Sequence, residues 1–131
     1  MLRITVYGFG SAFANTDAAK KVASDVDLLI VHQNTAPASC KLAIECKRRL
    51  VEAVPHAHVT MLSEGEEDLL QFIQTANATP IGTVRARLFH GDFELLCKGL
   101  AFIIGKENFA RNDPLDSGEE AQSSKRLDAV I

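Results

Sequence analysis

The pattern of hydrophobic and polar residues along the chain predicts three strands. Residues 2–7 are rich in β-branched and aromatic side chains, as strands usually are. Residues 26–32 are apolar almost without interruption, so we expect a strand that is covered on both faces. Residues 56–62 alternate in character, with one face formed by His56, His58 and Thr60 and the other by Ala57, Val59 and Met61. These segments together predict a small β-sheet.

Two segments have the periodicity of amphipathic helices. Residues 38–54 follow Pro37, which suits the first turn of a helix, and precede Pro55, which ends it. The apolar stripe of this helix consists of Leu42, Ala43, Cys46, Leu50, Ala53 and Val54, with Ile44 and Val51 on its flank. Ser63 and Glu66 have the spacing of a capping box, which predicts a second helix over residues 64–76.

The remaining segments up to residue 105 have weaker patterns. Residues 12–24 are small and polar, which indicates a loop, with a short helical turn over residues 17–23 as an option. Residues 83–89 and 93–105 suggest a hairpin, and a helix in the second of them is the alternative.

The order of these elements predicts the fold class. Strand, loop, strand, helix, strand and helix point to an α/β or α+β sandwich, in which helices flank a small mixed sheet. A chain of 131 residues suits one domain, which we place at residues 1–105. Residues 106–131 are polar and charged, so we expect a flexible tail there.

Composition and charge argue against several classes of protein. The net charge of -3 gives no support to non-specific binding of nucleic acid or of a membrane surface. No apolar stretch approaches the roughly 18 residues of a membrane span, and the amino terminus lacks the pattern of a signal peptide. The cysteines Cys40, Cys46 and Cys97 are odd in number and have no C-x-x-C spacing. We therefore expect a cytoplasmic protein with reduced thiols, without a zinc site or a disulfide.

Two aspartates stand at the start of the second predicted strand. Asp25 and Asp27 are two residues apart, so their carboxylates point to the same face of a strand. Close carboxylates repel each other unless a cation lies between them, and magnesium binds one or two protein carboxylates while leaving other positions to phosphates. The alternative is a pair of solvated acids at the beginning of a strand.

A glycine-rich turn follows the first predicted strand. Its residues Gly8, Gly10 and Ser11 do not complete a dinucleotide-binding fingerprint, because Phe13 stands where the third glycine is needed. Gly10 and Ser11 can still present backbone N–H groups and a hydroxyl to phosphate oxygens. The alternative is an ordinary tight turn.

In this order, the two motifs resemble a known signature. An apolar strand, Gly10-Ser11, a polar loop and Ser24-Asp25-Val26-Asp27 before an apolar run are similar to the DNA polymerase β-like nucleotidyltransferase superfamily. The nearest likeness is to its small minimal members, which include antitoxins paired with HEPN-domain toxins. The resemblance covers residues 4–31 and extends to about residue 76.

The resemblance implies a function and a set of site residues. Gly10 and Ser11 would hold the triphosphate of a nucleotide, with Ser24 and Lys21 as further nucleotide contacts. Asp25 and Asp27 would bind two magnesium ions. The reaction would transfer a nucleoside monophosphate from the triphosphate to a hydroxyl of a protein, an RNA end or a small molecule, so nucleic acid enters only as an acceptor.

The chain departs from the family pattern in two places. The third strand of such enzymes usually carries another carboxylate, and His58 stands at that position here. His58 either acts as a general base near neutral pH or simply packs or faces water. After Gly10-Ser11 the chain has Ala12, Phe13 and Ala14 in place of the usual arginine and glycine, and Phe13 either stacks on a base or packs in the core.

Two hypotheses about function follow from this likeness. The first is an active magnesium-dependent nucleotidyltransferase, whose acceptor pocket we expect to be completed by a partner protein or by a homodimer. The second is a catalytically degenerate binding module of the same fold, such as an antitoxin that acts by association with a toxin.

Overall fold

The computed structural model describes residues 1–13 and 25–105. Within these residues four strands form one mixed sheet in the order β3-β2-β1-β4. The first strand is antiparallel to the second and fourth, whereas the second and third are parallel. The strands are β1 (Arg3–Phe9), β2 (Val26–His32), β3 (Ala57–Ser63) and β4 (Thr79–Arg85). The mixed sheet and its helices confirm the predicted α+β fold class.

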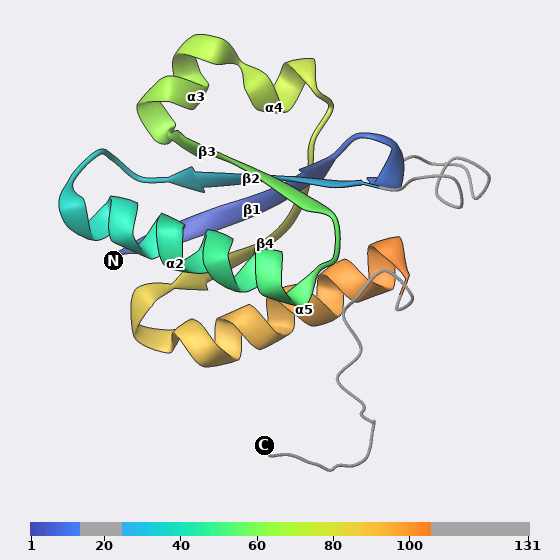
Figure 1. Ribbon diagram of the computed structural model, residues 1–131. Coiled ribbons are helices and arrows are strands. Elements are labelled where there is room, and N and C mark those ends of the chain that lie inside the picture. Colours follow the sequence, from blue (N-terminus) through green and yellow to red (C-terminus); the bar gives the residue numbers. More distant parts are fainter. Residues whose placement is uncertain (14–24, 106–131) are drawn as a thin grey trace.

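The helices cover the two faces of the sheet unequally. The two long helices, α2 (Pro37–Ala53) and α5 (Phe89–Ile104), lie on one face, and the short helices α3 (Glu64–Leu70) and α4 (Phe72–Thr75) lie on the other (Figure 1). Short 3₁₀ turns, η1 (Ser11–Phe13) and η2 (Ala86–Leu88), follow β1 and β4. The hydrophobic core lies between the sheet and the two long helices, and its fully buried side chains include Val6, Leu28, Ile30, Leu50 and Leu100.

The local predictions for β2 and α2 are confirmed. β2 is buried on both faces except at Asp27, as its continuous apolar character predicted. α2 begins at Pro37 and buries Leu42, Ala43, Cys46 and Leu50 of the predicted stripe. The flanking residues Ile44 and Val51 remain 57% and 49% exposed. The sheet therefore meets only the centre of the apolar surface of α2.

The predicted helix over residues 64–76 is wrong in its length. The capping box at its start is confirmed, because the Ser63 hydroxyl accepts the N–H of Glu66 and the Glu66 carboxylate accepts the N–H of Ser63. Gln71 then adopts a left-handed conformation with φ of 53°, which separates α3 from α4. The Glu67 carboxylate accepts the N–H groups of Phe72 and Ile73, so it begins the second helix where the first one ends.

The predicted hairpin after residue 83 is also wrong, and its alternative is correct. β4 begins earlier, at Thr79, and residues 89–104 form the helix α5. The helix buries Phe93, Leu96, Leu100 and Ile104, which recur every three or four residues. Because this segment is apolar around much of its circumference, its helical period is hard to recognise from the sequence.

Two strand boundaries differ from the prediction. β1 continues through Gly8 to Phe9, and β3 begins at Ala57. His56 lies before β3 in a left-handed conformation with φ of 63°, so it does not share the polar face of the strand with His58 and Thr60.

The structure bears on two of the predictions made from composition. The described helices include none that is long and apolar enough to cross a membrane. Cys40, Cys46 and Cys97 are free thiols, and burial raises the pKa of Cys46 to about 12. The predicted tail over 106–131 and the optional helical turn over 17–23 lie outside the described residues.

Candidate functional site

The sheet topology brings the glycine turn to the aspartates. Because β1 and β2 are antiparallel, the end of β1 lies beside the beginning of β2, and Phe9 is paired with Asp27. Gly10 has a φ of +82°, which an L side chain rarely adopts. A Cβ atom on Gly10 would lie 2.6 Å from Oδ2 of Asp27. The backbone at Gly10 therefore lies directly against this carboxylate, and only glycine leaves room for it.

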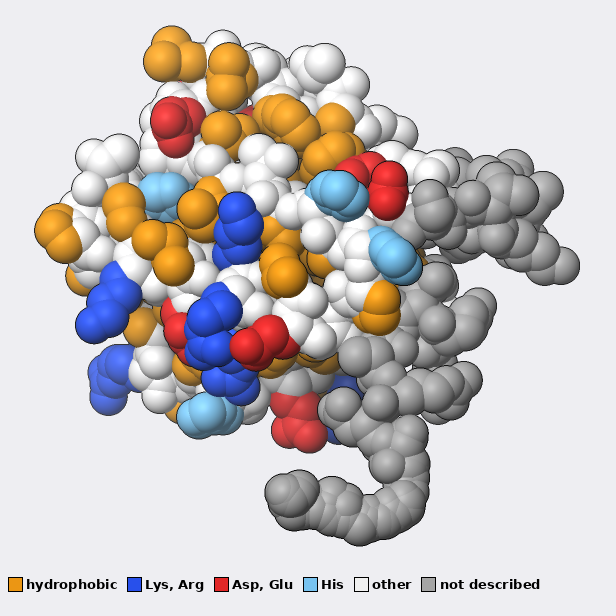
Figure 2. All heavy atoms as spheres, viewed as in Figure 1, with side chains coloured by type: hydrophobic (Ala, Val, Ile, Leu, Met, Phe, Trp, Pro, Cys, Tyr) orange, Lys and Arg blue, Asp and Glu red, His pale blue; other side chains and the backbone are white. Residues whose placement is uncertain are grey.

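The parallel pairing of β2 with β3 brings in the histidine. Asp27 and His58 are register partners, so their side chains leave the sheet on the same face. Asp25 shares that face because it lies two residues before Asp27, and its Oδ1 atom is 3.4 Å from Nε2 of His58. The His58 and Asp25 side chains are 64% and 58% exposed, so water and solutes can reach both. In Figure 2, histidine and acidic side chains gather where β2 and β3 begin.

The residues of the predicted phosphate turn have separate environments. Ser11 is exposed at the start of η1, next to Gly10. Phe13 packs against the core, and its ring occupies the space over Gly8, where an added Cβ would lie 2.2 Å from Cζ. This placement supports core packing as the role of Phe13. Lys21 and Ser24, the other expected nucleotide contacts, lie outside the described residues.

Asp25 and Asp27 supply oxygen atoms from one face of the sheet, which magnesium prefers. Within residues 1–13 and 25–105, no group of three or more His, Cys, Asp or Glu side chains is arranged to hold a metal ion. Two protein carboxylates match a site at which phosphate oxygens and water complete the coordination.

A wall of the site that the sequence did not reveal comes from α4. The ring of Phe72 lies edge-on to the ring of Phe9, with centroids 5.1 Å apart and planes at 80°. Because Phe9 is the register partner of Asp27, this contact fixes α4 beside the candidate metal site. Glu67 supports it by capping α4 through the N–H of Phe72. The alternation along β1 could have indicated the face of Phe9, but its partner 63 residues later has no local signal.

Comparison of the chain with protein-family models, with curated proteins and with solved structures gives no match.

Proposed function

We propose that this chain is a magnesium-dependent nucleotidyltransferase, which moves a nucleoside monophosphate from a nucleoside triphosphate to a hydroxyl acceptor. The observation that carries the proposal is the contact of the Gly10 backbone with the Asp27 carboxylate, with Asp25 and His58 on the same face. This contact supports a single site in which the glycine turn would bind phosphate beside a pair of carboxylates.

The glycine turn would bind the triphosphate. Gly10 and Ser11 are exposed at the end of β1, where the N–H and the hydroxyl of Ser11 would donate to phosphate oxygens. The N–H of Phe13 donates to the carbonyl oxygen of Gly10 and closes the turn. The left-handed conformation of Gly10 lets the backbone approach a ligand closely. The position of this turn beside Asp27 would orient the phosphates toward the carboxylates.

The two aspartates would hold the metal. Asp25 and Asp27 would bind two magnesium ions, which when bound supply charge neutralisation at the phosphates and orientation of the reacting oxygens. Asp25 is exposed and Asp27 is half-exposed, so both carboxylates would accept ions that arrive with a nucleotide.

His58 would move the proton. As the acceptor hydroxyl attacks the α-phosphate, its proton passes to Nε2 of His58, the nucleoside monophosphate joins the hydroxyl oxygen, and pyrophosphate leaves. Imidazole is suited to this task near neutral pH. Asp25, 3.4 Å away, would stabilise the protonated ring.

A binding module without turnover is the second candidate. The observation in its favour is His58, which stands at the position where the resemblance implies a third carboxylate. In that case nucleotide and magnesium would still bind, and the chain would act through association with a partner protein such as a toxin.

Nucleotide titration and label transfer test the proposal. Calorimetric titration with each common ribonucleoside triphosphate should show binding that needs magnesium and that is lost in Asp25→Ala and Asp27→Ala. Asp68→Ala on α3 removes an exposed acid elsewhere and is the matched control. Incubation with α-labelled triphosphates and purified RNA or protein acceptors should then give labelled acceptor and released pyrophosphate.

The variants of His58 separate the two candidates. For an enzyme, His58→Ala should bind nucleotide normally but transfer little label, and His58→Asp should keep or raise transfer by restoring a carboxylate. Magnesium-dependent binding without transfer to any acceptor would favour the binding module. Binding that is unaffected by either aspartate substitution would refute the site itself.

A further inference from the structure

One face of α5 carries large apolar side chains that are exposed in the described structure. Leu88 at the N-cap, Leu95 and Phe102 follow one another at seven-residue spacing and are 50%, 67% and 92% exposed. Residues seven apart lie on the same side of a helix, so Leu95 and Phe102 share one side of α5, and Leu88 stands at the N-cap before it. These three residues are called the stripe. The other side of the helix is buried in the core. Exposed apolar stripes of this kind mark interaction surfaces.

The neighbouring strand β4 is an edge of the sheet, but its outer side is poorly suited to pairing. The register with β1 shifts around Ile81, and Pro80 precedes this irregularity. Further along, the N–H of Arg85 is taken by the carboxylate of Asp92 at 3.0 Å. Bulges, prolines and covered N–H groups are the features by which proteins block strand addition. A partner at this surface therefore packs against α5 and does not extend the sheet.

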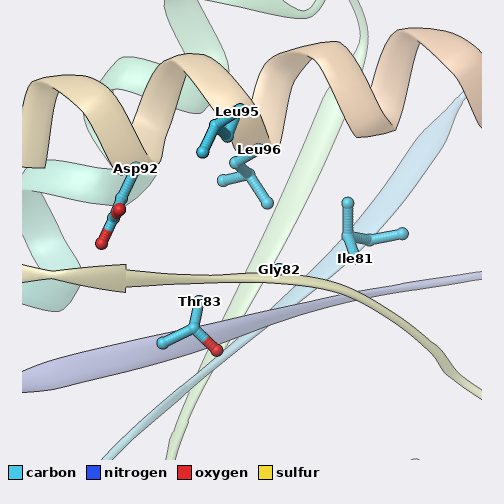
Figure 3. Close-up of a pocket in the computed structure, with 6 residues that line it drawn as sticks. All are labelled: Ile81, Gly82, Thr83, Asp92, Leu95 and Leu96. Atoms are coloured by element: carbon cyan, nitrogen blue, oxygen red, sulfur yellow. The ribbon is translucent and has the colours of Figure 1, made fainter.

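A pocket lies directly beside the stripe. It has a volume of about 200 Å³ and is lined by Ile81, Gly82, Thr83, Asp92, Leu95 and Leu96 (Figure 3). Gly82 keeps the strand close to α5, since a Cβ there would lie 3.2 Å from Cδ1 of Leu96. Leu95 thus projects at the rim of a hollow large enough for another aliphatic side chain. A projecting side chain and its receiving hollow in one patch are what a two-fold interface requires.

The spacing and charge of the stripe also suit pairing with itself. Leu95 lies midway between Leu88 and Phe102, so two antiparallel copies of α5 centred on Leu95 would bring Leu88 of each against Phe102 of the other. Glu94 and Lys98 are exposed and lie one turn apart beside the stripe. In the antiparallel pair, Glu94 of each copy would face Lys98 of the other.

We propose that α5 forms a two-fold symmetric interface with α5 of a second copy of this chain. Leu95 of each copy enters the pocket between α5 and β4 of the other, and reciprocal Glu94–Lys98 pairs flank the contact. The interface uses none of the candidate site residues, so it stands independently of the proposed function.

Sedimentation velocity and light scattering of the full chain over a range of concentrations test this interface. The wild type should show a reversible monomer–dimer equilibrium. Leu95→Glu should weaken dimerisation by about 30-fold or more, the usual cost of losing a central anchor. Because Leu95 is exposed, the variant should keep the circular dichroism spectrum of the wild type. The matched control is Val51→Glu, which places the same charge on an exposed apolar position of α2 and should leave the dimer intact.

A charge exchange gives a second, independent measurement. Glu94→Lys and Lys98→Glu should each weaken the dimer, because each places like charges together across the two-fold axis. The double variant should restore association, since the pairs are then merely reversed. A wild type that stays monomeric at every concentration would overturn the proposal. So would a dimer that Val51→Glu disrupts and Leu95→Glu does not, or a double variant as weak as the single ones.

Discussion

Replacing Gly10 with alanine tests whether the glycine turn and the Asp27 carboxylate form one site. The φ of +82° at Gly10 is unfavourable for a residue with a Cβ atom, which costs about 1–2 kcal/mol. Part of this cost is offset because alanine lowers the conformational entropy of the unfolded chain, which stabilises the protein by about 0.4–1 kcal/mol. We therefore expect Gly10→Ala to lower the free energy of unfolding by about 1 kcal/mol, or the midpoint of thermal unfolding by about 4 °C.

The effect of the same change on ligand binding should be larger. The added Cβ would lie 2.6 Å from Oδ2 of Asp27, so the half-exposed carboxylate must rotate away from its position. Displacing groups that orient a metal ligand typically weakens metal binding by about 10–100-fold. Calorimetric titration of the magnesium–triphosphate complex should show a loss of that order, while urea denaturation measures the change in stability.

Two other substitutions of glycine separate the effect of the backbone conformation from the effect of the added Cβ atom. Gly10→Asn tolerates the left-handed conformation better but brings the same Cβ atom, so it should recover stability without recovering affinity. Gly91→Ala, in the first turn of α5 with no atom within 4 Å of the added Cβ, should stabilise the protein by up to about 1 kcal/mol. The reasoning is refuted if Gly10→Ala binds the complex as the wild type does, or if it is as stable as Gly91→Ala.

Three further predictions concern the fold. Leu100→Ala, at a fully buried position, should cost about 2–5 kcal/mol in urea denaturation. Leu69→Ala, at an exposed position on α3, should change the stability by less than about 0.5 kcal/mol, and equal effects of the two changes would contradict the assigned core. Ser63→Ala should lower the free energy of unfolding by about 0.5–2 kcal/mol, because it removes the cap of α3. Ser63→Thr should retain most of the stabilisation by the cap. The Arg85 side chain and backbone N–H hold the pKa of Asp92 at about 2, below its ordinary 3.8. The stabilisation by Asp92 is therefore present above its pKa in the unfolded chain, 3.8, and is lost as the pH falls toward its pKa in the folded protein, about 2. The stability difference between wild type and Asp92→Asn should therefore shrink over that range in pH-dependent denaturation, and a constant difference would argue against the ion pair.

Local features of the chain could be predicted from the sequence because they depend on residues close together in the chain. The capping box of α3 involves residues three apart, and the start of α2 at Pro37 depends on the conformation that proline imposes. The burial of β2 on both faces follows from its continuous apolar character. Asp25 and Asp27 share a face for the same kind of reason, since side chains alternate along any strand.

Only the tertiary structure decided how these pieces meet. At the break at Gln71, Glu67 caps the next helix, and Phe72 of that helix contacts Phe9 of β1. α5 could not be distinguished from a hairpin because an apolar segment has no clear period.

In the candidate site, too, some features were predicted from the sequence and others were set by the tertiary structure. The sequence by itself predicted the residues of the candidate site, namely the glycine turn and the two aspartates. The contact of Gly10 with Asp27, and of Asp25 with His58, comes from strand pairing between segments far apart in the chain. Such pairing is set by the packing of the whole core, because a one-residue slip would turn every side chain of a strand to the other face.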